Sequence, residues 1–484
     1  MKHLPMLAAG VLAAVMTVAG AARAQTPCEQ LASVPLRDAT VTGAAVVPAG
    51  TVSACKIDVS AHPSGDSDIR IEIWIPAGAA WNGRYIQFGN GGFAGAIASQ
   101  RLAVAAAQGY AVAMTDDGHQ AVGTDAHWAI GHPEKVVDFG WRALRQTTIA
   151  AKALIAAYAG QPPRFSYFDG CSDGGREALM EAQRFPTDFD GILAGAPANN
   201  FSGLLTLGAY DMQQLARPGA FLGPDQLKAL EAAALARCGG GAYNAQPLSC
   251  GFDAATIACP AGKARPDCLT PPQVAAAAAI YGGLVGRSGR LLYPGYGSGA
   301  EAEPGGWSAW ITGPSPAQAS QALIYQFATG FWGGFVYGDP NFNLSKLDLS
   351  QAGVDAAKAA LIVDATDPDL ARFRDHGGKL IQYHGWNDPA IPARGSIAYY
   401  EAVRQRMGDP SGFYRLYIVP GMLHCGGGKG PSAVDWQALL QAWVEQGQAP
   451  GDVTARSRGP AGAVGAASQT LHPYTPVEVT SSRR

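Results

Sequence analysis

The stretch that decides the fold reads Phe165-Ser166-Tyr167-Phe168-Asp169-Gly170-Cys171-Ser172-Asp173-Gly174-Gly175-Arg176-Glu177. Residues 165–169 have the pattern of a strand, and residues 174–184 are predicted to form a helix. Between them, residues 170–174 match Gly-x-Ser-x-Gly, which in a strand–turn–helix context predicts a nucleophile elbow. Such a turn is crowded and strained, so its flanks need residues without a Cβ atom, and it lifts the Ser172 oxygen above the sheet.

Strands and helices alternate on both sides of this turn. The patterns predict strands at residues 68–75, 85–88, 110–114, 191–196, 379–384 and 413–419, and helices at residues 139–158, 396–406 and 432–445. This alternation predicts an α/β fold, with a mostly parallel sheet and helices on both faces. From residue 199 to about 361 the alternation of predicted strands and helices is absent. We therefore expect one domain, residues 25–198 and 362–484, interrupted by an insertion, residues 199–361.

The composition excludes several classes of protein. The chain has 484 residues, with 35 Lys or Arg and 38 Asp or Glu, so its formal net charge is −3. A nearly neutral chain lacks the basic surface that nucleic acid requires, so we expect no nucleic-acid partner. The 48% of hydrophobic residues argue against intrinsic disorder. The glycines have no three-residue period, which excludes collagen.

The first residues have the pattern of a secretory signal peptide. Residues 1–3 carry one Lys, residues 4–22 are almost wholly apolar, and Ala22-Arg23-Ala24 fits a cleavage site. We predict a signal peptide over residues 1–24, cut before Gln25, and hence a secreted or periplasmic protein. No later stretch reaches the roughly 20 apolar residues of a membrane span, so we expect no membrane partner.

A nucleophilic serine needs a base, and the base needs an acid that orients it. On this type of sheet the order along the chain is Ser, then Asp or Glu, then His, each after a strand. Asp388 and His424 each follow a predicted strand, at the sheet edge where α/β proteins place their ligands. The alternatives are His384 for the base, and Asp364 and Asp375, which precede their strand, for the acid.

Eight cysteines lie after the predicted cleavage site. In an oxidising compartment an even number suggests disulfides, although sequence alone allows 105 connectivities of eight cysteines. Two positions are more informative, because Cys171 directly precedes Ser172 and Cys425 directly follows His424. If Ser172 and His424 lie within hydrogen-bond reach, these cysteines are close as well. We therefore predict a disulfide that ties the turn to the histidine loop.

The oxyanion hole of such a site needs two N–H donors. The residue after the nucleophile supplies one of them, which here is Asp173. The second is expected from the loop that follows an early strand, and Gly89-Asn90-Gly91-Gly92 occupies that place. Within this loop we favour Gly92 over Gly91.

The chain resembles the tannase and feruloyl esterase family, which also includes the enzyme that hydrolyses mono(2-hydroxyethyl) terephthalate. The resemblance rests on residues 167–177, 89–95 and 377–389 and on His424-Cys425-Gly426. It covers nearly the whole chain after the predicted signal peptide. It implies an α/β-hydrolase fold in which the insertion is a lid domain.

The resemblance also assigns roles to individual residues. It implies that Ser172 is the nucleophile, His424 the general base and Asp388 the orienting acid. The disulfides that it implies are Cys171–Cys425, Cys28–Cys55, Cys238–Cys250 and Cys259–Cys268. Family members commonly bind a structural Ca²⁺ through an Asp-rich loop after the first lid cysteine. Residues 238–250 contain no Asp or Glu, whereas Ca²⁺ usually needs several carboxylate oxygens. We therefore expect that this calcium site is lost and that the protein has no metal or cofactor.

Together these residues predict hydrolysis of a carboxylic ester through an acyl-enzyme. The many aromatic residues of the insertion favour a flat aromatic acyl group and hence a small aromatic ester as partner. The resemblance implies that this acyl group is feruloyl, hydroxycinnamoyl or galloyl. The candidate substrate contacts are Trp307, Trp310 and Phe331 in the insertion and His384 and Ile391 near the acid. The alternatives are a terephthalate-monoester hydrolase, for which the insertion offers Arg287 and Arg290, an acyltransferase on the same fold, and a non-catalytic binding protein. No pattern indicates an oligomeric state.

Overall fold

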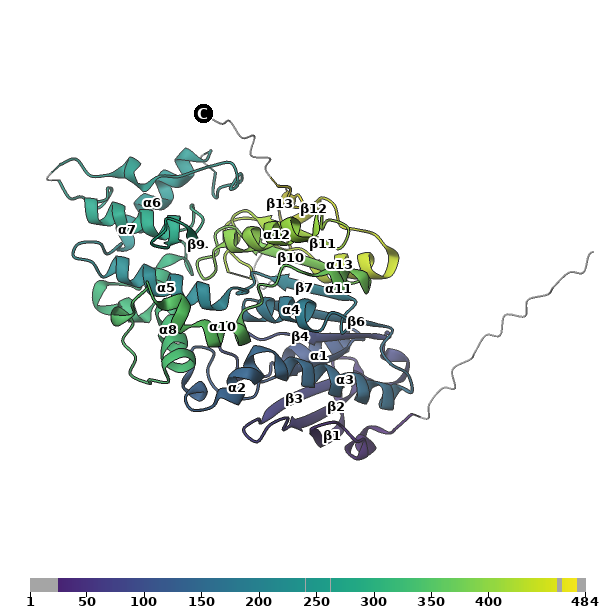
Figure 1. The fold of residues 1–484 in the computed structure, drawn as a ribbon. Helices are drawn as coiled ribbons and strands as arrows, with labels where there is room; N and C mark the ends of the chain where they lie inside the picture. Colours follow the sequence, from purple (N-terminus) through teal and green to yellow (C-terminus); the bar gives the residue numbers. More distant parts are fainter. Residues whose placement is uncertain (1–24, 240, 262, 459–463, 477–484) are drawn as a thin grey trace, which may run out of the picture.

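The computed structural model describes residues 25–239, 241–261, 263–458 and 464–476 (Figure 1). The predicted signal peptide lies outside these residues. At their centre is a nine-stranded sheet with the order β1-β2-β3-β5-β4-β6-β7-β10-β11. All neighbours from β5 to β11 are parallel, and the pairs from β1 to β5 are antiparallel. The prediction of an α/β fold with a mostly parallel sheet is confirmed.

The sequence patterns predict seven of these strands within two residues of their bounds. The strands are β1 (Ala39–Ala49), β2 (Val52–Ala61), β3 (Ile69–Pro76), β4 (Arg84–Phe88), β5 (Ala111–Thr115), β6 (Phe165–Cys171), β7 (Gly191–Gly195), β10 (Lys379–Gly385) and β11 (Tyr414–Val419). The patterns miss β1 and β2. Strand β1 forms the edge of the sheet, and all but one of its residues are exposed or half-buried, so it carries no strong apolar alternation.

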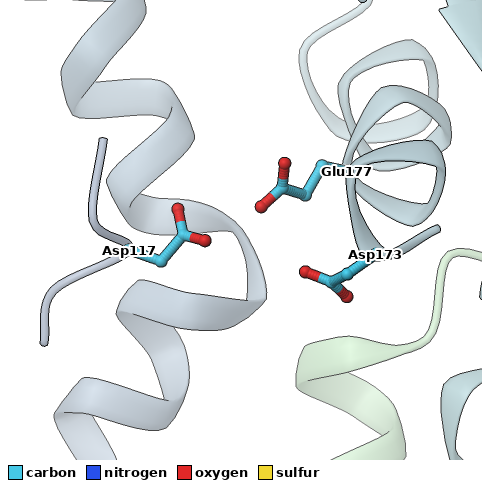
Figure 2. A group of neighbouring side chains, drawn as sticks. All are labelled: Asp117, Asp173 and Glu177. Atoms are coloured by element: carbon cyan, nitrogen blue, oxygen red, sulfur yellow. The ribbon is translucent and has the colours of Figure 1, made fainter. Parts of the chain in front are cut away.

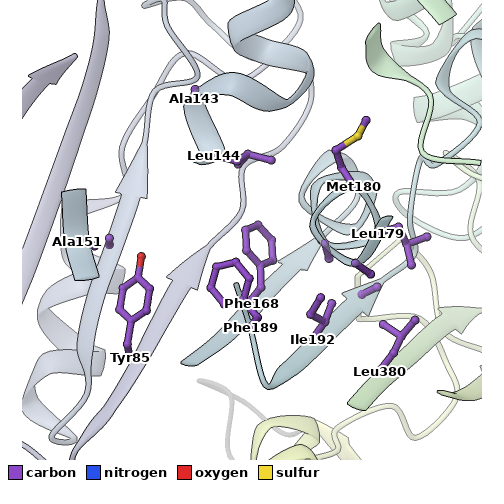
Figure 3. Close-up of a cluster of buried hydrophobic side chains, with 14 of the residues drawn as sticks. Tyr85, Ala143, Leu144, Ala151, Phe168, Leu179, Met180, Phe189, Ile192 and Leu380 are labelled. Carbon is purple, nitrogen blue, oxygen red and sulfur yellow. The ribbon is translucent and has the colours of Figure 1, made fainter. Parts of the chain in front are cut away.

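Helices cover both faces of the sheet, as predicted. The helices of one face are α3 (Ala143–Ala159), α4 (Asp173–Arg184) and α12 (Ala393–Met407), and those of the other are α1 (Ser99–Ala107) and α13 (Trp436–Gln446). Because side chains alternate along a strand, the neighbours on β6 and β7 enter different cores. Phe168 and Ile192 pack with Leu179 of α4 in one core (Figure 3), whereas Tyr167 and Leu193 belong to the other.

Several shorter elements complete the domain. They are α2 (Pro133–Val137), α11 (Ala371–Asp375) and the hairpin of β12 (Val453–Arg458) and β13 (Val464–Leu471). The hairpin lies in the C-terminal region, for which the sequence offers no clear pattern. None of the helices in the described residues combines the length and the hydrophobicity that crossing a membrane requires.

The insertion adds no described strand to the nine-stranded sheet. Its elements are α5 (Phe201–Leu215), α6 (Pro224–Arg237), α7 (Pro271–Gly282), β8 (Gly283–Val285), β9 (Leu291–Pro294), α8 (Leu323–Gly330), α9 (Ala352–Asp355) and α10 (Ala357–Val363). In Figure 1 they gather, in teal and green, on one side of the sheet. Leu207, Ile280 and Trp332 are fully buried in a core that the insertion shares with Phe93 and Phe139 of the sheet domain.

Candidate active site

Ser172 stands on a strained turn between β6 and α4. Its backbone φ is 68° and its ψ is −121°, a conformation that residues other than glycine rarely adopt. A Cβ atom on Gly170 would lie 2.2 Å from the backbone oxygen of Gly174, and one on Gly174 would lie 2.7 Å from the backbone oxygen of Asn90. Packing therefore requires both glycines of the motif, and the turn places Ser172 at the carboxyl end of β6.

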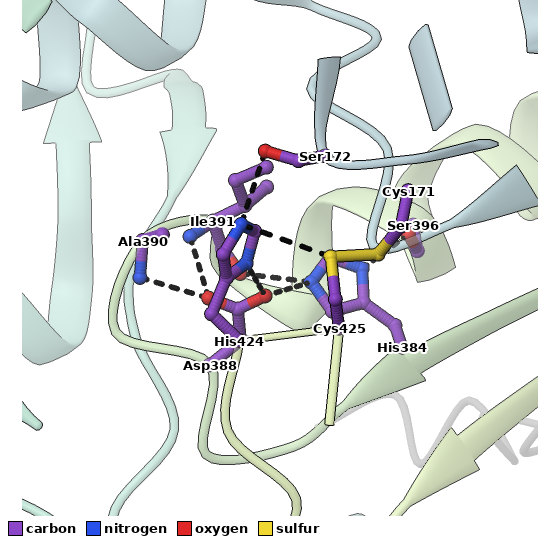
Figure 4. Close-up of a disulfide and its surroundings, with 9 residues drawn as sticks. All are labelled: Cys171, Ser172, His384, Asp388, Ala390, Ile391, Ser396, His424 and Cys425. Atoms are coloured by element: carbon purple, nitrogen blue, oxygen red, sulfur yellow. Dashed lines mark hydrogen bonds and ion pairs between the residues drawn. A yellow bond between two sulfur atoms is a disulfide. The ribbon is translucent and has the colours of Figure 1, made fainter. Parts of the chain in front are cut away.

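The structure brings the three predicted triad residues together (Figure 4). His424 Nε2 lies 3.0 Å from Ser172 Oγ, and His424 Nδ1 lies 2.7 Å from Asp388 Oδ2. The other carboxylate oxygen, Asp388 Oδ1, accepts backbone N–H bonds from Ala390 at 2.8 Å and from Ile391 at 3.0 Å. In this geometry the imidazole can take the serine proton while the carboxylate fixes the imidazole tautomer.

A second histidine contacts the same carboxylate. His384 is fully buried; its Nε2 lies 3.2 Å from Asp388 Oδ2, and its Nδ1 lies 2.7 Å from Ser396 Oγ. Burial acts to raise the pKa of Asp388, but His424 and His384 outweigh it and hold this pKa well below its usual range. His384 does not line the pocket described below, so its predicted role as a substrate contact is corrected. It packs behind Asp388 and supports the ionised carboxylate.

The alternative acids are engaged elsewhere. Asp364 accepts hydrogen bonds from the backbone N–H and the hydroxyl of Ser202 at the start of α5. Asp375 forms a surface ion pair with Arg374 at 2.7 Å. Asp388 is therefore the carboxylate that the fold presents to His424.

A disulfide joins the nucleophile turn to the histidine loop. Cys171 and Cys425 are bonded, although 254 residues separate them along the chain. Cys425 has a φ of 48°, so the backbone on both sides of the Ser172–His424 contact is locally strained. The remaining disulfides are Cys28–Cys55, Cys238–Cys250 and Cys259–Cys268. These are the pairs that the family resemblance implies.

Three backbone N–H groups are available to an oxyanion. Gly91, Gly92 and Asp173 line the same pocket as Ser172, and their N–H groups donate no hydrogen bond to any described residue. Asp173 begins α4, where the helix dipole favours negative charge. Gly92 has a φ of 62°, and a Cβ atom there would lie 2.3 Å from the backbone oxygen of Gly123. The geometry accommodates Asp173 and Gly92 as donors and leaves Gly91 as the alternative.

Ser172 and His424 open into a pocket of about 350 Å³. Most of its walls are apolar and come from α5, from the rest of the insertion and from the loop after Asp388. These wall residues are Ala198, Phe201, Leu204, Leu205, Trp310, Ile324, Phe327, Ala390 and Ile391. The Trp310 ring meets the His424 ring edge-on, with centroids 5.2 Å apart, and is parallel to Phe327 at 6.3 Å. The pocket therefore offers flat aromatic surfaces next to the reacting serine.

Two of the predicted substrate contacts, Trp310 and Ile391, line this pocket. Two others do not, and these predictions are corrected. Trp307 is 3% exposed and packs on Tyr281 inside the insertion, and Phe331 is fully buried against Phe201. Both are core residues, and the sequence cannot separate core aromatics from pocket aromatics because both are apolar.

No arginine or lysine among the described residues lines the pocket. Arg287 and Arg290 lie in the exposed turn between β8 and β9. The ionisable side chains at the pocket are those of His424 and Asp173, and the Asp173 carboxylate is paired with buried Arg176 at 2.5 Å. The part of the chain that the structure describes thus offers this pocket no free cation for a charged acyl group.

A second cavity, which is polar, is also lined by the disulfide. It has a volume of about 410 Å³ and shares Cys171 and Cys425 with the apolar pocket. Its polar lining consists of Asn90, Arg101, Asp169, Tyr383, Ser432, Asp435, Gln437 and Arg458. Both amide atoms of Gln437 are buried without a partner in the described residues. Sequence reasoning misses this cavity because its residues come from widely separated segments.

Comparison with known proteins agrees with this site. A family model described as "Tannase and feruloyl esterase" matches residues 55–479. The chain belongs to this family. An uncharacterized esterase of Xanthomonas campestris pv. campestris is 38% identical over 92% of this chain and 86% of its own length. The mono(2-hydroxyethyl) terephthalate hydrolase of Piscinibacter sakaiensis is 33% identical over 84% of this chain and 78% of its own.

A solved structure of the same family has a similar fold. The crystal structure of feruloyl esterase B from Aspergillus oryzae has a TM-score of 0.84 and 27% identity, and the match covers 92% of this chain and 95% of that chain. The tannase-family chain is therefore a carboxylic ester hydrolase with an α/β-hydrolase fold.

The strain at Ser172 yields a stability prediction. Ser172→Gly and Ser172→Ala both remove the hydroxyl, and each is expected to lower kcat by about 10⁶-fold. A non-glycine residue in such a conformation costs about 1–3 kcal/mol, and the greater unfolded-state freedom of glycine offsets about 0.5–1 kcal/mol of this. We therefore expect the free energy of unfolding of Ser172→Gly, measured by urea denaturation, to be about 1 kcal/mol higher than that of Ser172→Ala. Equal or reversed stabilities would contradict the strain.

Proposed function

We propose that this esterase hydrolyses esters of hydroxycinnamic acids, feruloyl esters among them, through an acyl-enzyme on Ser172. The observation that carries the proposal is the Ser172–His424–Asp388 geometry at the mouth of an apolar, aromatic pocket without a free cation. We also propose that the protein is exported. The four disulfides, which persist in oxidising compartments, support export.

The mechanism follows from the hydrogen bonds of the site. Ser172 Oγ attacks the ester carbonyl as its proton passes to His424 Nε2, 3.0 Å away. The carbonyl oxygen becomes an oxyanion and accepts hydrogen bonds from the N–H groups of Asp173 and Gly92. His424 returns the proton to the leaving alcohol, and a water molecule then repeats these steps on the acyl-enzyme. Asp388, kept ionised by its two histidine contacts, stabilises the imidazolium that forms twice per turnover.

The pocket walls favour one acyl class over the alternatives. A cinnamoyl ring matches the flat faces of Trp310 and Phe327, and burial of apolar surface contributes about 25 cal/mol per Å². A galloyl group would place three hydroxyls against apolar walls, and each unpaired buried hydroxyl costs about 1–3 kcal/mol. A terephthalate monoester would bury a carboxylate with no arginine or lysine on the wall, which is costlier still.

The polar cavity favours a polar alcohol in the other half of the ester. The leaving oxygen must lie beside His424 Nε2, and the next residue, Cys425, belongs to both cavities. We propose that the alcohol extends past Cys425 into the cavity that Arg101, Gln437 and Arg458 line. The guanidinium groups of Arg101 and Arg458 and the amide of Gln437 can hydrogen-bond to a ligand with several hydroxyl groups. We therefore propose that the alcohol is a sugar.

We further propose that activity needs no metal ion. Glu231 is the first acidic residue on the N-terminal side of the Cys238–Cys250 loop. Its carboxylate pairs with Lys429 at 2.6 Å and accepts a hydrogen bond from the N–H of Ala302 at 2.9 Å. Lys429, which also lies 3.8 Å from Glu303 Oε1, places a positive charge of the chain itself at this carboxylate, and this supports the proposal.

A panel of esters tests the substrate proposal. We expect kcat/KM for methyl ferulate to exceed that for methyl gallate and for mono(2-hydroxyethyl) terephthalate by at least about tenfold, which corresponds to 1.4 kcal/mol. With the acyl group held constant, a feruloyl arabinose ester should have a lower KM than methyl ferulate. Preference for gallate or terephthalate would overturn the acyl assignment, and an equal or higher KM for the sugar ester would overturn the alcohol assignment.

Chelation tests the metal proposal. Dialysis against EDTA is expected to leave both Tm and methyl ferulate turnover unchanged, and added Ca²⁺ should not raise either value. A drop in Tm after EDTA that Ca²⁺ reverses would show that the protein uses a structural calcium ion.

A further inference from the structure

The loop that presents Gly91 and Gly92 is anchored through the residue before them. Asn90 is 8% exposed, and its side-chain amide donates to the carbonyl oxygen of Thr115 at 2.8 Å and to Asp117 Oδ2 at 3.0 Å. Its backbone N–H donates to Glu177 Oε2 at 2.9 Å. Asn90 is thus held by two carboxyl groups that come from different elements, the segment after β5 and helix α4.

These two carboxyl groups also lie close to each other. The side chains of Asp117 and Glu177 are buried and point toward one another (Figure 2), and their carboxyl oxygens come within 4.8 Å of each other. Asp117 Oδ1 and Glu177 Oε1 have no hydrogen-bond partner in the described residues. Two ionised carboxylates so close together in a low-dielectric interior would repel each other, whereas one bound proton removes this repulsion and allows one carboxyl group to donate to the other.

The neighbouring charges do not remove the need for that proton. The charged and titratable groups that face the pair are Asp173, Arg176 and Glu181 on α4. Arg176 binds both oxygens of Asp173, at 2.5 and 3.0 Å, so its charge is already matched. The carboxylates of Asp117, Asp173 and Glu177 lie within 4.8 Å of one another, but this Arg176 bond occupies Asp173. Burial, the largest cause, and the nearby Asp173 raise the pKa of both members of the pair.

The other end of the loop is fixed independently. The Phe93 N–H donates to the carbonyl oxygen of Gly123 at 2.7 Å, and the Phe93 carbonyl accepts from His119 Nε2 at 2.7 Å. Burial lowers the pKa of His119 to about 4, so this ring stays neutral while the pair titrates. The anchor that responds to pH is therefore the one at Asn90.

We propose that Asp117 and Glu177 are positioning residues that share one proton and, through Asn90, hold the N–H groups of Gly91 and Gly92 where the oxyanion forms. This inference rests on the proposed esterase function. Glu177 also packs tightly against the start of this loop. A Cβ atom on Gly89 would lie only 2.5 Å from Glu177 Oε2.

The proposal predicts how activity depends on pH. Because the pair has a raised pKa in the folded chain, the shared proton is present at neutral pH and is lost as pH rises. Loss of the proton leaves two carboxylates in contact in a low-dielectric interior, where they repel each other. Asn90 then keeps its bonds to the Thr115 carbonyl and the Gly174 N–H but loses the precise position that the pair gives it. We expect kcat to fall while KM for the ester changes little, because the donors act in the transition state.

Three variants of α4 test this proposal with methyl ferulate as the substrate. In Glu177→Gln the amide oxygen accepts the Asn90 N–H and the amide nitrogen donates to Asp117 without any proton. We expect its kcat at neutral pH to stay within about threefold of wild type and its alkaline fall to move up by at least one pH unit. In Glu177→Ala the anchor is absent, and we expect a loss of about 10²-fold in kcat at unchanged KM, as for removal of an oxyanion donor.

Glu181→Gln is the matched control. Glu181 is equally buried, lies one turn further along α4 and also has a raised pKa, but it does not contact Asn90. Its pH profile of kcat should match that of wild type. An unshifted alkaline fall in Glu177→Gln, or wild-type kcat in Glu177→Ala, would overturn the proposal. If Glu177→Ala does not fold, Glu177→Gln alone decides. A wild-type chain inactive on every ester would instead overturn the proposed function.

Discussion

The turn at Ser172 is the constraint on which the rest of the site depends. Its positive φ brings the start of α4 back against the end of β6, so Gly170 and Gly174 are in backbone contact. The same turn packs Gly174 against the backbone of Asn90. The nucleophile turn, the start of helix α4 and the first residues of the oxyanion loop therefore meet at one backbone contact.

The remaining parts of the site reach that unit from distant segments. Asp388 and His424 follow two neighbouring parallel strands, whose carboxyl ends meet the end of β6 at one edge of the sheet. The Cys171–Cys425 disulfide fixes the distance between the turn and the histidine loop. The sheet thus supplies the reacting groups, while the insertion supplies the aromatic walls around Trp310. With this division, the residues of the insertion can change the substrate while the reacting groups stay the same.

The sequence was sufficient wherever a local motif dictates the structure. Ser172 and its glycines, the order of Asp388 and His424, and the paired positions of Cys171 and Cys425 follow from spacing and the strand-end rule. Features that depend on contacts between distant segments could not be derived. Trp307 and Trp310 are three residues apart and equally apolar, yet one lies in the core and the other in the pocket. The contact between Asp117 and Glu177 likewise has no sequence signal, because burial alone gives it meaning.

Ester hydrolysis at this site requires Ser172 to be the activated nucleophile, and labelling of the folded chain with a fluorophosphonate measures this property. We predict one adduct per chain by intact mass, located on Ser172 by peptide mapping, with no adduct in Ser172→Ala and strongly slowed labelling in His424→Ala. An active, folded protein that forms no adduct on Ser172 would show that Ser172 is not the nucleophile.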